Sequence, residues 1–432
     1  MTPSPDAPPL AGVRVVDLSR VLAGPYATMT LADLGADVVK VEHPVGGDET
    51  RSWGPPYAGG EAAYFLSVNR SKRSVALDLK DPEGRELALE LCARADVVIE
   101  NFRPGGAARL GLDYDAVRRR RSDVVYCTIN GFGRREPRDR PGYDFVIQAE
   151  SGLMSITGEP DGTPMKVGVA VVDVLAGLNA TTAILAALRR RDRSGDGELI
   201  EISLLDSAFA ALVNVAENAL VTGVDPGRYG NAHPSIVPYQ PFRAADGFVA
   251  VAAANDGLYR RLCDAIERPE LAADERYATN EARVRNRESL VAELEAVFAS
   301  RPTEDWVRLL LSSGVPPARS AASARPYAWR PRRECPPPPG LLIRLPALSS
   351  SWRRRSRSTA LRSALRRRHP CSGSTRRRCW TSLAWTPSAC RRSSTAAWSR
   401  RQGLRRISRD VDGRSRLGWR RSRRGRRARS GA

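Results

Sequence analysis

The sequence predicts an α/β fold with a Rossmann-like parallel sheet, and two observations lead to it. Short runs of β-branched residues alternate with helical patterns through the first half of the chain. Two of these runs, Val97-Val98-Ile99 and Val124-Val125-Tyr126, are apolar throughout, as interior strands covered on both faces are. The helical segments between the runs supply the crossovers that parallel neighbours need.

The expected elements follow in order along the chain. Strands are predicted in VRVVDLS (13–19), DVVKVEHP (37–44), DVVIENF (96–102), DVVYCTINGFG (123–133) and LIEISL (199–204). Helices are predicted at about 26–34, 82–95, from Asp173 to about 191, and from about Leu205 to Val221. No GxGxxG follows the first strand, and GAD at 35–37 leads into a strand, so an NAD site is not expected.

A smaller α+β domain is expected after the large one. GRYGNAHPSIVPYQPFRAADG (227–247) is rich in Gly, Pro and polar residues and predicts an ordered surface loop. A strand in 247–255 and helices in 257–267, 282–300 and 303–314 follow, the last with Thr303 as its start. The predicted domains are therefore residues 1–227 and 228–316, with an irregular tail at 317–432.

Charge is distributed very unevenly. The whole chain carries +21, but about 33 of its 69 basic residues and only about 3 of its 48 acidic ones follow Pro316. The part before that point sums to about −9 and the tail to about +30. One explanation is a disordered, Arg-rich arm that binds nucleic acid.

A second explanation for the tail is translation in the wrong reading frame. The segment has no Lys, Asn, Phe or Met, shows no useful periodicity, and clusters Trp and Cys that disordered segments normally lack. Codons shifted by one base from Pro317 to Tyr327 can spell GPVRSVGEAL, an ordinary loop leading into a helix. We favour a single-base slip near Pro316, and we expect no nucleic-acid partner.

The remaining composition indicates a cytoplasmic protein with reduced cysteines. No uninterrupted apolar run reaches the roughly 18 residues of a membrane span, and the first residues do not look like a signal peptide, so no membrane partner is expected. Cys92, Cys127 and Cys263 have no metal-ligand spacing and suit core thiols. We expect neither a metal nor a redox cofactor.

The segment KVGVAVVDVLAGLNATTAILAALRR (166–190) places one carboxylate, Asp173, in an apolar stretch between an expected strand and a helix. Burying an unpaired carboxylate is costly, so such a residue is normally a helix N-cap, half of an ion pair, or a reactive group. The spacing alone favours the N-cap, with catalysis as the alternative.

Six phrases in order resemble the family III CoA-transferases. They are LAGVRVVDLSRVLAGPYATMTLADLGADVVKVE (10–42), NRSKRSVALDLKDPEGRE, VIENFRPG, GYDFVIQAESGLMSITG, the Asp173 segment, and RSGDGELIEISLLDSAFA. The resemblance covers residues 10 to 316. It implies that Asp173 is the nucleophile, which forms a mixed anhydride with the acyl group of an acyl-CoA and then an aspartyl-CoA thioester. It also implies an interlocked homodimer.

Further site residues are carried over from the same resemblance. Leu22 stands where the formyl-CoA enzyme has a glutamine near the reacting carbonyl, which argues against a formyl or oxalyl substrate. His43 and Lys80 match positions near the CoA nucleotide, Leu77 lies beside the adenine, and Asn101 and Arg109 match pantetheine and phosphate contacts. Cations suit a phosphorylated ligand, but on their own these residues would be ordinary surface, turn or strand-end residues.

Tyr143 distinguishes two branches of the resemblance. The family's racemases have G-H-D where this chain has Gly142-Tyr143-Asp144, and a phenol with a pKa near 10 is a poor base for an α-proton. Transfer of CoA is therefore favoured over acyl-CoA racemisation or dehydration. Tyr143 is assigned to the CoA-binding residues, with a core tyrosine as the alternative.

The loop YGNAHPSIVPYQPF resembles the branch that moves CoA from succinyl-CoA to dicarboxylic or hydroxy-dicarboxylic acids. Asn231 and His233 are the candidate substrate-binding residues, because both can donate hydrogen bonds to a distal carboxylate. They could equally hold the loop by bonding its backbone. The predicted partners are thus an acyl-CoA and a carboxylic acid.

Overall fold

A computed structural model describes residues 7–133 and 140–319, and its first part contains a six-stranded sheet in the order β5-β2-β1-β6-β7-β8. All neighbouring strands are parallel. In sequence order this is the arrangement 3-2-1-4-5-6 of doubly wound nucleotide-binding folds, so the predicted α/β fold is confirmed. The strands are β1 (Arg14–Asp17), β2 (Asp37–Glu42), β5 (Arg73–Ala76), β6 (Val97–Glu100), β7 (Val125–Asn130) and β8 (Glu198–Ser203).

The two apolar runs form the interior strands β6 and β7, as predicted. Their side chains alternate between two cores, since successive residues of a strand point to opposite faces. Val97 and Ile99 belong to one core, whereas Val98 and Tyr126 belong to the other. The sheet is therefore buried on both faces.

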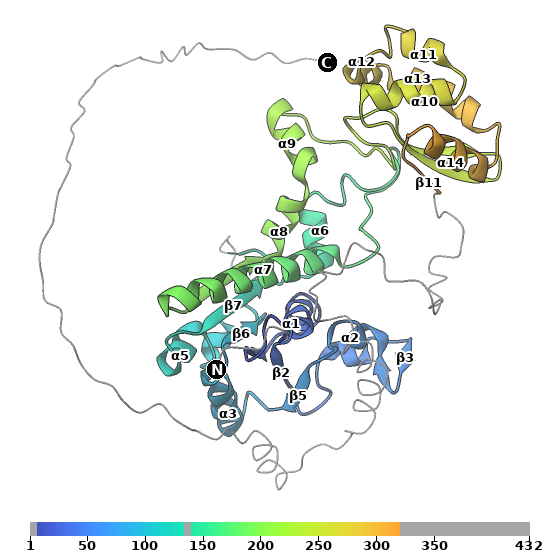
Figure 1. Cartoon of the computed structure of the whole chain (residues 1–432). Helices are drawn as coiled ribbons and strands as arrows, with labels where there is room; N and C mark the ends of the chain where they lie inside the picture. The colour runs from blue at the N-terminus through green and yellow to red at the C-terminus, as the bar shows by residue number, and fades with distance from the viewer. Residues whose placement is uncertain (1–6, 134–139, 320–432) are drawn as a thin grey trace, which may run out of the picture. The chain divides into compact units, whose positions relative to one another are not determined.

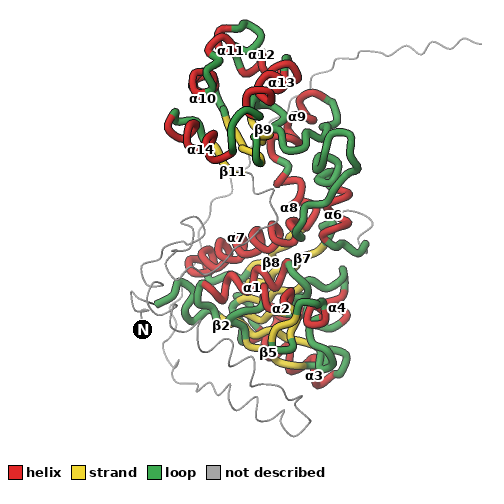
Figure 2. Tube along the Cα trace, turned by 90° about the vertical axis from the view of Figure 1, so that its right-hand side faces the viewer, coloured by secondary structure: helices red, strands yellow, loops and turns green. Residues whose placement is uncertain are grey.

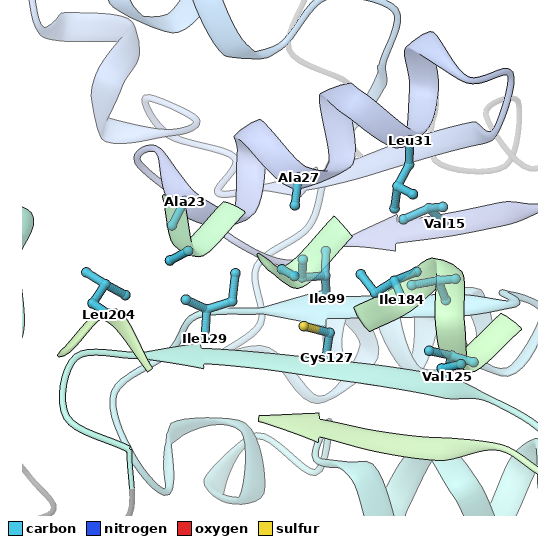
Figure 3. Packing of buried hydrophobic residues seen from close by; sticks show 14 of the residues in the cluster. Val15, Ala23, Ala27, Leu31, Ile99, Val125, Cys127, Ile129, Ile184 and Leu204 are labelled. Carbon is cyan, nitrogen blue, oxygen red and sulfur yellow. The ribbon is translucent and has the colours of Figure 1, made fainter. Parts of the chain in front are cut away.

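Helices α1 (Ala23–Asp33) and α7 (Val171–Ser194) cover one face of this sheet, and α3 (Pro82–Ala93) and α5 (Tyr114–Arg120) pack on the other (Figure 1). Ala23, Ala27 and Leu31 recur every four residues and point from α1 toward the strands (Figure 3). The small side chains of Ala23 and Ala27 let α1 lie close to the sheet. The other elements of this part are η1 (Glu49–Ser52), β3 (Tyr57–Ala58), β4 (Glu61–Ala62), α2 (Ala63–Val68), α4 (Gly106–Arg109) and α6 (Asp144–Glu150).

The single helix predicted from Leu205 to Val221 is wrong. The chain forms α8 (Leu204–Ala211) and α9 (Val213–Thr222), whose axes differ by 79°. The break lies at Leu212, because Val213 has a φ of 34°, which a right-handed helix does not contain. No residue of α9 is fully buried.

A second sheet, in the order β11-β10-β9, is antiparallel. It consists of β9 (Tyr239–Ala244), β10 (Gly247–Ala252) and β11 (Pro317–Arg319), and its helices are α10 (Asp256–Ala265), α11 (Pro269–Ala273), α12 (Asn280–Arg285), α13 (Arg287–Phe298) and α14 (Thr303–Ser312). Figure 2 shows these helices gathered around β9 and β11. Their core draws only on residues 237–315, separately from the cores of the first sheet.

Three details differ from the sequence-based expectations in this second part. The end of the predicted surface loop is the strand β9, which buries Phe242 and Ala244 on one face. The single helix expected over 282–300 is divided at Asn286 into α12 and α13, whereas α14 starts at Thr303 as expected, with Asp246 accepting hydrogen bonds from the backbone and the hydroxyl of Thr303. Antiparallel strand pairing continues to Arg319, three residues beyond the predicted end of the second domain. The rest of the tail lies outside the described residues, and so does the reading-frame hypothesis for it.

Among the described residues, α7 is the helix that could cross a membrane by length and composition, and the bent pair of α8 and α9 would also pass that test. One face of α7, which includes Ala176, Ala180 and Ile184, is buried in the core on the first sheet. This is the packing of a central helix in a doubly wound domain.

Candidate functional site

The carboxyl ends of the parallel strands meet at one edge of the first sheet, and the strand order reverses there between β1 and β6. Ligands of open α/β sheets bind at such a reversal. Asn101 bridges it, because its side-chain amide accepts from the backbone N–H of Arg20 and donates to the carbonyl of Arg20, both at 2.8 Å. Asn101 thus fixes the loop after β1 to the loop after β6.

The other residues predicted to contact CoA also follow strands that end at this edge. His43 follows β2 and is exposed, and its Nδ1 accepts from the backbone N–H of Val45 at 3.1 Å. Leu77 and Lys80 follow β5, the first half-buried and the second exposed. Arg109 is exposed in α4, after β6. Parallel topology therefore brings their backbones to the same edge.

Asp173 lies in the first turn of α7, and the N-cap prediction for it is wrong. The helix begins at Val171 with Ala170 as its N-cap, and residues 166–170 form no strand. The capping acceptor is Asp144, whose Oδ1 accepts from the backbone N–H groups of Val172 at 2.8 Å and Asp173 at 3.3 Å. A carboxylate from another helix thus takes the place of a local cap.

Gln148 completes this support. It is fully buried in α6, where its Nε2 donates to Asp144 at 2.6 Å and its Oε1 accepts from the backbone N–H of Val167 at 2.9 Å. The amide therefore holds both the capping carboxylate and the segment that leads into α7. The backbone of Asp173 is fixed before any ligand binds, as a reacting group requires.

The environment of Asp173 is apolar and negatively charged. Burial raises the pKa of Asp173, and the nearby carboxylate of Asp144 raises it further, to about 7. Burial likewise raises the pKa of Tyr64 to about 12, with Asp173 as the next cause, so the phenol lies near this carboxylate. Leu22, at the N-cap of α1, belongs to the same apolar cluster as Val174 and Tyr64.

The structure thus brings Leu22 to the turn that carries Asp173. The backbone before Leu22 is unusual, because the β-branched Val21 has a φ of 68°. Such a conformation costs about 1–3 kcal/mol and persists only where its surroundings impose it. The loop after β1 is held in this shape beside Asp173.

Helices α1 and α7 approach each other closely one turn after Asp173. A Cβ atom on Gly177 would lie 2.7 Å from the carbonyl oxygen of Ala23, a distance that real Cβ atoms do not show. Glycine is therefore required at this crossing. The close contact fixes the start of α7 against the start of α1, where Leu22 lies.

A buried ionic network supports the loop after β1. Asp17 accepts from Ser19, from Thr28 and, at 3.1 Å, from Lys72. Burial alone would raise the pKa of Asp17, but Lys40 and Lys72 lower it to about 2. The network holds the first turn after β1 in place, and it was not predicted from the sequence.

Tyr143 is the N-cap of α6 and exposes 56% of its surface, so it is not a core tyrosine. Its neighbour Asp144, which the sequence analysis passed over, is buried and caps α7. The signal was present, since a charged residue directly follows Tyr143 in the phrase GYDFVIQAESG. Its partner in α7 could not be read from spacing.

The two candidate substrate residues of the loop differ in their surroundings. Asn231 is exposed. His233 is half-buried, and its Nδ1 accepts from the backbone N–H of Ser235 at 3.0 Å. Burial lowers the pKa of His233, and the charge of Arg287 lowers it further.

This loop is tied to the segment that precedes Asp173. Arg228 donates to the carbonyls of Ser155, Glu159, Pro160 and Gly162. Gly230 donates to the carbonyl of Gly158 at 3.1 Å. The loop and the approach to α7 are therefore connected by hydrogen bonds.

A six-stranded parallel sheet in this strand order, with a partly buried aspartate of raised pKa in the first turn of α7, is a doubly wound α/β domain with a candidate ligand site at the carboxyl edge of its strands. The sequence model of CoA-transferase family III matches residues 10–325. The chain belongs to CoA-transferase family III and is a CoA-transferase.

Named relatives agree with this family. The chain is 53% identical to the succinate–glutarate CoA-transferase of Agrobacterium fabrum over 66% of its own length and 73% of the relative. It is 48% identical to the succinyl-CoA:glutarate CoA-transferase of Mus musculus over 71% of each chain. A solved CAIB/BAIF family protein from Brucella suis is 46% identical, with a TM-score of 0.65 over 73% of this chain and 85% of that one.

Proposed function

We propose that this chain moves CoA from succinyl-CoA to a dicarboxylic acid through an aspartyl-CoA thioester on Asp173. Transfer of CoA to dicarboxylic acids is supported by the relatives, two of which are named for succinate or succinyl-CoA and glutarate. The covalent route is supported by the surroundings of Asp173. The single observation that carries the proposal most directly is the placement of Asp173, which is partly buried beside the apolar cluster of Leu22 and Val174 with its backbone N–H held by Asp144.

The reaction needs four bond exchanges. An oxygen of Asp173 attacks the thioester carbonyl of succinyl-CoA, and CoA leaves as a thiolate to give a mixed anhydride. The thiolate then attacks the aspartyl carbonyl, and succinate leaves. The acceptor carboxylate attacks the aspartyl thioester, CoA leaves again, and its thiolate attacks the new acyl carbonyl, which frees Asp173 and releases the new acyl-CoA.

A carboxylate suits this sequence because its acyl derivatives remain reactive enough to pass the group to another carboxylate. Water must be excluded, since it would hydrolyse the anhydride and the thioester. Leu22, Tyr64 and Val174 supply apolar surface around the start of α7. A carboxylate of raised pKa is a stronger nucleophile once it is ionised, which favours its attack on the thioester carbonyl.

CoA would lie along the carboxyl edge of the first sheet. Lys80 and Arg109 are exposed cations there and would pair with phosphates, while Leu77 would contact the adenine. His43 would lie near the nucleotide, and Asn101 would present the loop after β6 to the pantetheine arm. These assignments predict that charge removal at Lys80 or Arg109 raises the KM for the CoA donor more than it lowers kcat.

The proposal is tested by mixing the full chain with succinyl-CoA and glutarate and following glutaryl-CoA by chromatography. Asp173→Asn keeps the size of the side chain but cannot form the anhydride, so we expect turnover to fall by at least roughly 1,000-fold. An Asp192→Asn variant, changed at an exposed position of the same helix, serves as the control. Turnover retained in Asp173→Asn would overturn the proposal.

A further inference from the structure

Arg287, the first residue of α13, lies against the loop of residues 229–239. Its Nη2 donates to the carbonyl oxygens of His233 at 2.9 Å and Pro234 at 2.8 Å. Its guanidinium carbon lies 5.5 Å from the centre of the Tyr229 ring. No pattern in the sequence points to this residue.

The other terminal nitrogen of Arg287, Nη1, is buried and has no hydrogen-bond partner among the residues that the structure describes. Burial lowers the pKa of Arg287, so its charge is incompletely compensated. Buried guanidinium groups are normally paired with an anion or fully hydrogen-bonded. The open nitrogen therefore requires an explanation.

Arg283, on the preceding helix, provides the contrast. It contacts the same loop, but each of its nitrogens has a partner, namely Val237 at 2.7 Å, Tyr277 at 3.0 Å and Asp256 at 2.7 Å. Asn280 also holds the loop, since it donates to the carbonyl of Ser235 at 2.9 Å. The loop is thus anchored by residues whose hydrogen bonds are satisfied, and anchoring does not account for Nη1 of Arg287.

His233 adds a second donor beside this guanidinium. Because its Nδ1 accepts a hydrogen bond from Ser235, the neutral ring carries its hydrogen on Nε2. The lowered pKa of His233, caused by burial and by Arg287, agrees with a neutral ring close to the cation. Arg287 contacts the backbone carbonyl of His233, so one residue pair supplies a guanidinium and an imidazole N–H, donors that suit the two oxygens of a carboxylate.

We propose that Arg287, together with His233, binds the free carboxylate of the dicarboxylic substrate and thereby selects dicarboxylic over monocarboxylic acids. This inference rests on the proposed function. A carboxylate is favoured over a phosphate because one guanidinium and one neutral imidazole supply a single positive charge. The hydrogen bonds between this loop and residues 158–162 connect the site to the segment that leads to Asp173.

The test compares glutarate with pentanoate, a monocarboxylic acid of the same chain length, as acceptors for CoA from succinyl-CoA. In Arg287→Gln we expect kcat/KM for glutarate to fall roughly 10- to 100-fold, the usual effect of losing a charge-assisted hydrogen bond, while the value for pentanoate stays within about 2-fold. Arg285→Gln is the matched control, because Arg285 is exposed two residues away and pairs with Glu281. It should leave both values unchanged.

An equal loss on both acceptors, or no loss on glutarate, would overturn the inference while leaving the proposed function intact. A wild-type chain that uses neither acid would refute the proposed function instead. Should Arg287→Gln unfold, Arg287→Lys supplies the test through the melting temperature. Glutarate should stabilise the wild type more than pentanoate does, and this difference should shrink in Arg287→Lys; an undiminished difference would contradict the proposal.

Discussion

Replacing Asp173 with Asn should make the folded protein more stable at neutral and alkaline pH. The carboxyl is partly buried near another carboxylate, and its pKa is about 7 instead of the ordinary 3.8. One unit of pKa difference between the folded and unfolded chains corresponds to about 1.4 kcal/mol. The full difference sets an upper bound of about 4 kcal/mol on the destabilisation that ionised Asp173 causes at pH 8.

The expected gain in the free energy of unfolding is smaller than this bound. The side chain of Asp173 is not completely removed from water, and Asn lacks any interaction that the protonated carboxyl of Asp173 makes. We expect Asp173→Asn to raise the free energy of unfolding at pH 8 by about 1–2 kcal/mol, or the melting temperature by about 2–8 °C. The Asp173 carboxyl binds its proton more tightly in the folded chain than in the unfolded chain. The destabilisation caused by its ionisation is therefore absent below its pKa in the unfolded chain, near 4, and grows as the pH rises to about 7.

Thermal unfolding of both proteins from pH 4 to pH 8 measures this effect. The stability difference should be close to zero at pH 4, increase through pH 5 and 6, and level off above pH 7. Asp192→Asn, in the exposed last turns of α7, should show no such increase. A variant that is less stable than the wild type at pH 8, or a difference that does not vary with pH, would refute the reasoning.

Three further predictions concern the support of the site. Asp144→Asn keeps an acceptor for the start of α7 but removes the negative charge beside Asp173, so the acid limb of the profile of kcat/KM against pH should move to lower pH. Gly177→Ala should destabilise the fold by about 1–3 kcal/mol in urea, because its Cβ would meet the carbonyl of Ala23. Arg283→Met should cost about 1–3 kcal/mol in the same assay, since it removes the hydrogen bonds that the buried guanidinium donates to the carbonyls of Val237 and Tyr277.

Each of these predictions has a contradicting outcome. An acid limb that stays in place in Asp144→Asn would show that this charge does not act on Asp173. Stabilisation by Gly177→Ala, as expected for an uncrowded helical position, would contradict the close approach of α1 and α7. An Arg283→Met variant with wild-type stability and unchanged hydrogen exchange in residues 229–239 would contradict the role of Arg283 in anchoring the loop.

The strands of the first sheet could be predicted because the apolar residues within each strand indicate that the strand is buried. The all-apolar runs in β6 and β7 indicated interior strands, and the alternation with helices indicated parallel pairing. No GxGxxG phrase follows the first strand, yet the strand order is that of nucleotide-binding folds. Topology and fingerprint are separate properties of the sequence.

The contacts that shape the site could not be predicted, because they join residues far apart in the chain. Asp144 caps α7 from 29 residues earlier, and the spacing around Asp173 therefore suggested the wrong cap. The need for Gly177 arises only where α7 crosses α1. The open nitrogen of Arg287 becomes visible only when the loop lies against α13. Local patterns identify elements, whereas tertiary packing decides which side chains remain available.

Trapping the covalent intermediate is the most direct test of the role of Asp173 as the nucleophile. The full chain is incubated with succinyl-CoA without an acceptor and then treated with hydroxylamine, which converts an activated carboxyl to a hydroxamate, and the peptides are analysed by mass spectrometry. We expect a hydroxamate at Asp173 that is absent from Asp173→Asn. A hydroxamate at Asp144 instead, or none at Asp173 while turnover proceeds, would contradict this role.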